Sequence, residues 1–196
     1  MKTRAFVCIE FPDEIIKEVA RIQSLIEKQK FTGKLTELEN LHLTLKFLGE
    51  ISPEQLEKVK EKLSSIKFPA FEAKLLNLGT FSYKDQPKII WLKIGGKSGA
   101  VGRVEGGGEK SNIYELQKQI DESLKETFQK EERFMSHLTI ARIKHTKSPD
   151  IFKEYLKNIS VKPISFQINS FFLKSSELKP LGPVYTTFAE YKLVNL

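Results

Sequence analysis

One short motif occurs twice in the chain. His42-Leu43-Thr44 and His137-Leu138-Thr139 each lie in an apolar run, and together they contain two of the three histidines. Alternate side chains of a β-strand face the same way, so each imidazole would share a face with the hydroxyl two residues later. Imidazoles titrate near neutral pH, and threonine hydroxyls donate hydrogen bonds without changing charge. The pattern therefore predicts acid–base chemistry on a phosphate.

Similar elements surround the two motifs. Apolar residues at helical spacing predict one helix from Asp13 to about Lys30 before the first motif and another over residues 113–128 before the second. Ser52-Pro53 and Ser148-Pro149 follow the two histidines by ten and eleven residues, and each would start a further helix. A helix, a motif strand, a Ser-Pro start and a helix thus recur in the same order, which indicates an internal duplication.

The remaining regular elements are predicted to be strands. Apolar residues bounded by turn signals mark strands at residues 5–9, 41–48, 71–78, 88–94, 134–143, 164–173 and 184–193. We therefore predict an α+β fold in which residues 1–196 form one domain. Because of the duplication, this domain would consist of two similar lobes, of about residues 1–87 and 88–196, with strands that could be exchanged between them.

The composition is that of an ordinary globular protein. At 196 residues, 40% hydrophobic and 29% charged, the chain can bury a core without metal or disulfide support. No apolar run is long enough to span a membrane, and the first residues lack a secretory signal pattern, so we expect a cytoplasmic location and a monomer. Cys8 lies in an apolar stretch, which favours a buried small hydrophobe over a reactive thiol.

The charge and the glycine distribution carry less information. The net charge of +7 would attract a polyanion, but lysine and glutamate alternate along the predicted helix faces, so charge alone does not establish a nucleic-acid partner. Residues 95–108 hold seven of the eleven glycines and predict a mobile loop without site residues. His145, which lies outside both motifs, is predicted to be a surface residue.

The sequence predicts neither a metal site nor a cofactor site. It has no His-Glu-x-x-His spacing, no cysteine pair, and no carboxylate within either motif to serve as a third ligand. Acid–base catalysis by the histidines themselves is therefore favoured over metal catalysis.

The residues around the motifs resemble the 2H phosphoesterase superfamily, and in particular the RNA 2′,3′-cyclic phosphodiesterase family, formerly called 2′-5′ RNA ligase. The similarity is carried by residues 42–49 and 137–142, and it extends to residues 4–6, 89–91 and 178–185. The resemblance implies two pseudo-twofold-related lobes of antiparallel sheet with helices on their outer faces. It also implies a central cleft across which the two motifs face each other.

The same resemblance implies an activity. It is the metal-independent hydrolysis of RNA 2′,3′-cyclic phosphate ends, including those of tRNA fragments, to 2′-phosphates, with 2′-5′ ligation as the reverse reaction. The resemblance assigns His42 as proton donor and His137 as proton acceptor, whereas the nearly equivalent motifs by themselves leave this order open. A pair of histidines predicts a bell-shaped rate profile with its maximum at about pH 6 to 7.5.

Four further side chains are predicted to bind the phosphate. Thr44 and Thr139 would donate hydrogen bonds to its non-bridging oxygens. Lys46 has the same alternation parity as His42, so it would extend this face toward the phosphate or the next nucleotide. Arg142 resembles an arginine that follows the second motif of the family. Strict alternation places it opposite the second histidine, so only a bulge or strand end would bring it to the substrate.

Aromatic side chains offer a place for a nucleobase to stack, and the sequence does not decide which of them does so. The candidates are Phe81, Tyr83, Trp91 and Tyr185.

Two other interpretations of the chain stay open. One is a phosphodiesterase for a small cyclic phosphate of the ADP-ribose 1″,2″-cyclic phosphate type. The other is a non-catalytic RNA-binding module, in which the histidines only hydrogen-bond phosphate.

Overall fold

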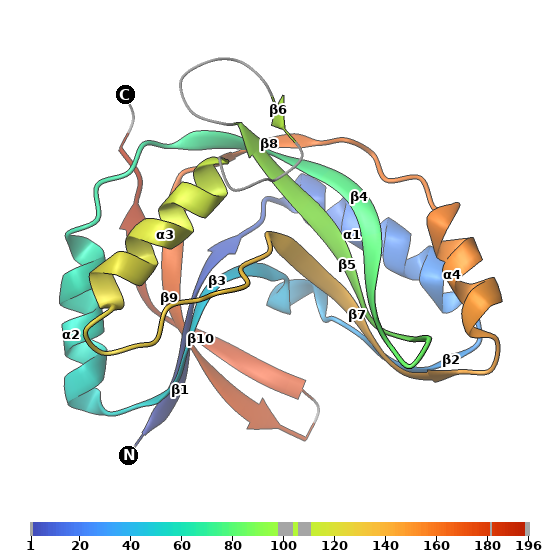
Figure 1. Cartoon of the computed structure of the whole chain (residues 1–196), viewed down its shortest axis with the longest axis horizontal. Coiled ribbons are helices and arrows are strands. Elements are labelled where there is room, and N and C mark those ends of the chain that lie inside the picture. Colours follow the sequence, from blue (N-terminus) through green and yellow to red (C-terminus); the bar gives the residue numbers. More distant parts are fainter. Residues whose placement is uncertain (1, 98–103, 106–110, 181, 195–196) are drawn as a thin grey trace.

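The computed structural model describes residues 2–97, 104–105, 111–180 and 182–194, and it has the predicted α+β class (Figure 1). Its strands form two antiparallel sheets. The first has the order β10–β9–β1–β3 and comprises Gly182–Lys192, Ser170–Lys179, Thr3–Glu10 and His42–Ile51. The second has the order β2–β7–β5–β4–β8 and comprises Phe31–Leu35, His137–Thr146, Gln86–Lys97, Phe71–Tyr83 and Ser165–Ile168. A short strand, β6 (Val104–Glu105), pairs with β5.

The helices lie on the outer sides of the sheets (Figure 1). α1 (Asp13–Glu27) contacts β7, and α4 (Pro149–Lys157) contacts β4 and β5. α2 (Pro53–Ser64) and α3 (Asn112–Leu124) pack against each other, and they contact β10 and β3 respectively. A 3-10 helix, Leu38–Asn40, leads into β3. No helix among the described residues is both long and apolar enough to cross a membrane.

The predicted helix starts are confirmed in part. Ser52 and Gln55 form the expected capping box, in which the Gln55 amide donates to the Ser52 hydroxyl at 3.2 Å and the Ser52 amide donates to Gln55 Oε1 at 2.9 Å. Ser148 precedes α4 as predicted but makes no side-chain cap bond. α1 ends at Glu27 rather than near Lys30, because the chain then turns into β2.

Each sheet combines strands from both halves of the chain. In one sheet β1 pairs with both β3 and β9, and in the other β2 pairs with β7 and β4 pairs with β5. The apolar pattern does not predict β2, which has Phe31 and Leu35 at its ends and polar or glycine residues between them. Residues 164–173 divide at Asn169 into β8 and β9, which enter different sheets. A boundary near residue 87 therefore does not separate one sheet from the other.

Part of the glycine-rich segment is paired backbone rather than a loop. Residues 95–97 end β5, and Gly96 and Lys97 pair with Glu105 and Val104 of β6. The prediction of a loop is therefore wrong for these residues, because backbone pairing compensates for the missing side chains. The remainder of the predicted loop, residues 98–103 and 106–108, lies outside the described residues.

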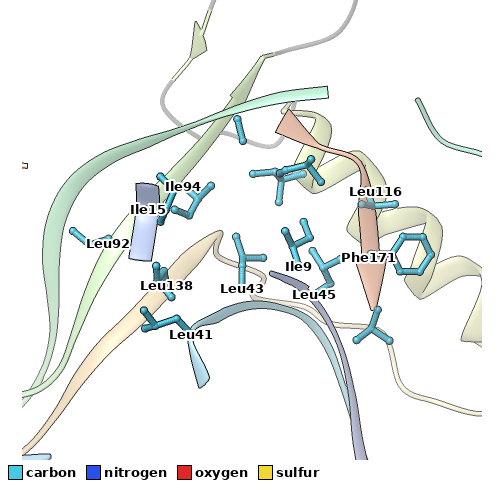
Figure 2. Packing of buried hydrophobic residues seen from close by; sticks show 14 of the residues in the cluster. Ile9, Ile15, Leu41, Leu43, Leu45, Leu92, Ile94, Leu116, Leu138 and Phe171 are labelled. Atoms are coloured by element: carbon cyan, nitrogen blue, oxygen red, sulfur yellow. The ribbon is translucent and has the colours of Figure 1, made fainter. Parts of the chain in front are cut away.

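A single apolar core lies between the sheets and the helices (Figure 2). The motif leucines, Leu43 and Leu138, are fully buried there beside Ile9 and Leu92. Packing of these leucines fixes the direction in which the neighbouring histidines and threonines point. Cys8 is fully buried, as predicted, and burial raises the pKa of its thiol to about 12, which disfavours the reactive thiolate.

Candidate active site

Both motif strands contain a β-bulge directly after the threonine. In β3 the pairing register skips Leu45, and in β7 it skips Ile140. A bulge adds one residue to one strand, so the side chains that follow it change faces. The two strands consequently share one burial pattern, in which the bulge residue and the next residue are both buried.

The bulge in β3 overturns the prediction for Lys46. Instead of sharing the face of His42, the Lys46 side chain turns to the buried side, where it is only 2% exposed and pairs with Asp121. It therefore does not extend the site toward a phosphate. The side chain that returns to the histidine face is Phe47, which is 65% exposed. Hydrophobic periodicity misses Phe47 because it contains no signal for the bulge.

The bulge in β7 brings Arg142 to the histidine face. The sequence predicts that Arg142 reaches the substrate only if a bulge or a strand end interrupts the alternation of side chains. The bulge at Ile140 is such an interruption. Arg142 is exposed. Burial is the main influence on two pKa values of the other sheet: it lowers that of His42 and raises that of Tyr185. The charge of Arg142 acts to lower both pKa values. The guanidinium therefore lies near groups of the other sheet.

The two histidines are held in the same way. Nδ1 of His42 lies 2.8 Å from the carbonyl oxygen of Asn40, and Nδ1 of His137 lies 2.7 Å from that of Met135. A carbonyl oxygen only accepts hydrogen bonds, so Nδ1 must carry the proton in each ring. Nε2 is then the nitrogen that can exchange a proton with a substrate.

The two motif strands come together in the fold. β3 and β7 belong to different sheets but contact each other where the sheets meet (Figure 1).

Burial lowers the pKa of His42 below its ordinary value, and the charges of Lys174 and Arg142 lower it further. The Asn40 carbonyl and the Glu10 carboxylate act in the opposite direction. Burial prevails, so the net shift of the His42 pKa is downward.

Thr44 and Thr139 occupy equivalent positions in the two strands. Each is half-buried and shares the face of its histidine, because the bulge begins only after it. In the adjoining strands Thr44 lies opposite Cys8 and Thr139 lies opposite Trp91. Each threonine thus lies on the same strand face as its histidine.

Each histidine also contacts two aromatic rings. The His42 ring centroid lies 4.9 Å from that of Phe6 and 5.2 Å from that of Tyr185. The His137 centroid lies 5.6 Å from that of Phe81 and 6.4 Å from that of Trp91. Three of the four predicted stacking candidates therefore adjoin a histidine. Tyr83, at the end of the β4–β5 hairpin, contacts neither ring within the described part of the chain.

A glycine makes room for one of these rings. A Cβ atom on Gly79 would lie 2.4 Å from the Trp91 ring, which covers this position from the neighbouring strand. Any larger residue would push Trp91 away from Gly79 and so disturb the ring beside His137.

A buried polar network connects α3 to the strand of the first motif. Lys46 pairs with Asp121 of α3 and donates a 2.7 Å hydrogen bond to the carbonyl oxygen of Gln129. Asp121 also accepts from the Gln117 amide group at 2.6 Å and from the backbone amide of Glu131 at 3.1 Å. The network therefore joins β3 to the segment that leads into the second motif.

A matching contact connects α1 to the strand of the second motif. Gln23 of α1 is buried, and its amide nitrogen donates to the carbonyl oxygens of Thr36 at 2.7 Å and Ile140 at 2.9 Å. Ile140 is the bulge residue of β7, and its carbonyl oxygen also accepts from the Thr36 amide at 2.9 Å, so Gln23 adds a second donor at the bulge. The helix before each motif thus holds the strand of the other motif.

The described residues do not form a metal centre. They contain no group of three or more histidine, cysteine, aspartate or glutamate side chains that could hold an ion. His145 is exposed, as predicted, and lies at the far end of β7 from His137.

The chain is similar to known phosphoesterases in sequence. The family model described as LigT like Phosphoesterase matches residues 9–91 and 107–185. A protein of Methanocaldococcus jannaschii named RNA 2′,3′-cyclic phosphodiesterase is 33% identical over 191 residues, which cover 96% of this chain and 99% of the relative. A protein of the same name from Aeropyrum pernix is 32% identical over 179 residues, which cover 91% and 96%.

Solved structures show the same fold. TT0787 of Thermus thermophilus matches with a TM-score of 0.74 at 24% identity, and the match covers 98% of each chain. Escherichia coli LigT complexed with 3′-AMP matches with a TM-score of 0.67 at 20% identity, and the match covers 100% of each chain.

Proposed function

Because the chain belongs to the LigT-like phosphoesterase family, we propose that it hydrolyses the 2′,3′-cyclic phosphate ends of RNA to 2′-phosphates with a pair of histidines. The observation that carries the proposal is the hydrogen bond from Nδ1 of each histidine, His42 and His137, to a backbone carbonyl oxygen. This bond leaves Nε2 of each ring to exchange a proton. Relatives about a third identical over nearly the whole chain are named RNA 2′,3′-cyclic phosphodiesterases, which supports RNA as the substrate.

The proposed reaction opens the five-membered phosphate ring in line. Nε2 of neutral His137 takes a proton from water as the water oxygen bonds to phosphorus. Nε2 of protonated His42 gives its proton to the ribose O3′ as the bond between phosphorus and O3′ breaks. The product carries a 2′-phosphate and a free 3′-hydroxyl, and solvent returns each histidine to its starting state. Each proton transfer is worth roughly 10² to 10⁴ in rate.

Three neutral or cationic donors would stabilise the negative charge on the non-bridging phosphate oxygens. Thr44 and Thr139 share the faces of the two histidines, and Arg142 supplies a guanidinium near His42. The bound phosphate is itself an anion, so its arrival would raise the pKa of His42 and restore the proton donor. The side chains therefore supply both proton transfers and the charge stabilisation, and the proposed reaction needs no metal.

Reversal of the same steps would join a 2′,3′-cyclic phosphate end to a 5′-hydroxyl through a 2′-5′ linkage, with the two histidines exchanging roles. We propose that the enzyme acts in the cytoplasm as a monomer, on RNA ends that include those of tRNA fragments.

The test is turnover of an oligonucleotide that ends in a 2′,3′-cyclic phosphate, with excess chelator present. Mass spectrometry and phosphatase sensitivity identify the product, which we expect to be the 2′-phosphate. Loss of activity on chelation, or a 3′-phosphate product, would contradict the proposal. An ADP-ribose cyclic phosphate assayed in parallel distinguishes an enzyme for small cyclic phosphates. Binding of the oligonucleotide without turnover would indicate a binding module.

A further inference from the structure

The proposed reaction determines near which residues the rest of an RNA chain continues. His42 protonates the ribose O3′, so the terminal ribose lies on the side of His42. The O5′ of this ribose carries the phosphodiester to the preceding nucleotide, a group that a mononucleoside cyclic phosphate lacks. An RNA end therefore brings a second anion to the first sheet. This step rests on the proposed function.

Arg4 lies on the histidine face of that sheet. It precedes Phe6 by two residues in β1, and the Phe6 ring centroid lies 4.9 Å from that of His42 and 5.0 Å from that of Tyr185. Where β1 pairs with β3, the extra residues of both bulges belong to β3, so β1 keeps its alternation and Arg4 shares the face of Phe6. Burial raises the pKa of Tyr185, and the Arg4 charge acts to lower it, so the guanidinium lies near this group of rings.

Two other cations near His42 are already engaged. Arg142 is assigned to the cyclic phosphate by the proposed reaction. Lys174, whose side chain is only 13% exposed, pairs with Glu10. Arg4, by contrast, is exposed, and within the described part of the chain no ion pair or side-chain hydrogen bond engages it. It is therefore the cation of this face that can meet a second anion.

The carboxylate that strand pairing brings opposite Arg4 does not occupy it. Glu50 of β3 is the residue opposite, and it is also exposed. The two side chains face the same side of the sheet, but no ion pair joins them. Exposed pairs of this kind contribute little free energy, so Glu50 would compete only weakly with a phosphate for the guanidinium.

We propose that Arg4 binds the phosphodiester that joins the terminal nucleotide to the preceding one. The planar guanidinium can donate two hydrogen bonds to the oxygens of one phosphate. A contact to the backbone is independent of the base, so it would respond to the presence of a preceding nucleotide and not to its sequence. Arg4 would thereby make the enzyme favour RNA ends over mononucleoside cyclic phosphates.

The test compares two dinucleotides that differ in the charge between their nucleosides. Both end in adenosine 2′,3′-cyclic phosphate, and the preceding nucleoside is joined through a phosphodiester in one and an uncharged methylphosphonate in the other. We expect the wild type to favour the phosphodiester substrate by about tenfold in kcat/KM, the effect of charge-assisted hydrogen bonds to one phosphate. Arg4→Gln should bring the ratio close to one, mainly through KM, whereas Arg4→Lys keeps the charge and should retain most of the preference.

The dependence on salt gives a second readout. For the phosphodiester substrate, the slope of log kcat/KM against log salt concentration should be shallower by about 0.7 in Arg4→Gln than in the wild type, the value for one phosphate contact of a single strand. The ratio of the two substrates within one variant does not depend on the fraction of enzyme that is folded, so a loss of stability cannot imitate the expected result.

Lys157→Gln is the matched control. It also removes one positive charge, but the Lys157 side chain is 74% exposed at the end of α4, which contacts strands of the other sheet. The control should keep the wild-type preference. Retention of the preference in Arg4→Gln, an equal loss in both variants, or a wild type that does not distinguish the two substrates would overturn the proposal while the enzyme remained a cyclic phosphodiesterase. Absence of turnover of both substrates in the wild type would refute the proposed function, and this inference with it.

Discussion

The half-site around His42 and the half-site around His137 share a backbone and differ in the side chains placed on it. Both strands have the same burial pattern, the same bulge and the same bond from the histidine Nδ1 to a carbonyl two residues earlier. After the bulge they diverge, because one strand continues with Lys46 and Phe47 and the other with Ala141 and Arg142. The two strands thus keep the same pair of histidines, while the two positions after the bulge carry different side chains.

The supporting contacts differ as well. The first motif strand is held by an ion pair between Lys46 and Asp121, and the second by neutral hydrogen bonds from Gln23. In each case the holding residue comes from the helix before the other motif. The two halves therefore depend on each other. Each half supplies a helix that holds the motif strand of the other half in place.

Replacing either histidine gives the largest expected effect. His42→Ala and His137→Ala should each lower kcat for a cyclic phosphate end by roughly 10² to 10⁴, because each removes one proton transfer. The double variant should be little worse than either single variant, since the two transfers serve one reaction. Steady-state kinetics at pH 7 give the values, with the exposed His145→Ala as control. A variant that retains half of the wild-type rate would show that the two half-sites do not share the chemistry.

Lys46→Met tests the ionic support of the first half-site. It leaves the Asp121 carboxylate buried without its cation, which should lower the free energy of unfolding by about 3–5 kcal/mol. The double variant Lys46→Met, Asp121→Leu replaces both charges by apolar groups and should recover most of the loss. Urea denaturation at pH 7 gives both values. A single variant that costs less than about 1 kcal/mol would contradict the assigned role.

Arg142→Gln tests the position at which the second half-site differs from the first. Loss of charge-assisted hydrogen bonds to the phosphate should lower kcat/KM by roughly ten- to a hundredfold. It should also raise the pKa of His42, because the Arg142 charge lowers it in the wild type. Kinetics and an NMR titration of the His42 ring measure the two effects. Arg142→Lys keeps the charge and should leave the pKa near its wild-type value, and a downward shift in Arg142→Gln would contradict the geometry.

Gln23→Ala tests the neutral support of the second half-site. The variant would lose the two hydrogen bonds from Gln23 to the carbonyl oxygens of Thr36 and Ile140, while Ile140 keeps the bond from the Thr36 amide. We expect a cost of about 1–3 kcal/mol in the free energy of unfolding. The loss should be smaller than that in Lys46→Met, because no charge is left without its partner. Urea denaturation of the two variants side by side decides the order, and the reverse order would refute this account of the supports.

The titration of His42 shows the smallest expected effect. Burial lowers the pKa of His42, so an NMR titration of its ring in the free protein should have its midpoint below 6.5. A bound phosphate should move this midpoint to higher pH, because the anion favours the protonated ring. A midpoint above pH 7 in the free protein would contradict burial as the main influence on His42.

The sequence by itself determined the α+β class, the duplication and the catalytic candidates. These follow from local rules: the spacing of apolar residues defined the helices and most strands, and alternation placed each histidine beside a threonine. The capping box at Ser52 and the burial of Cys8 follow from their nearest neighbours in the chain. In each case the residues that decide the structure lie within a few positions of one another.

Only the tertiary structure decided where Lys46, Phe47 and Arg142 point. Each position depends on a bulge, which arises from pairing with a strand far away in the sequence, β1 for β3 and β5 for β7. The same limit applies to β2, whose weak apolar pattern becomes a strand because β7 of the other half offers it an edge. A period-two pattern cannot register one extra residue in a strand, and that residue reverses the side chains after it as far as the next irregularity.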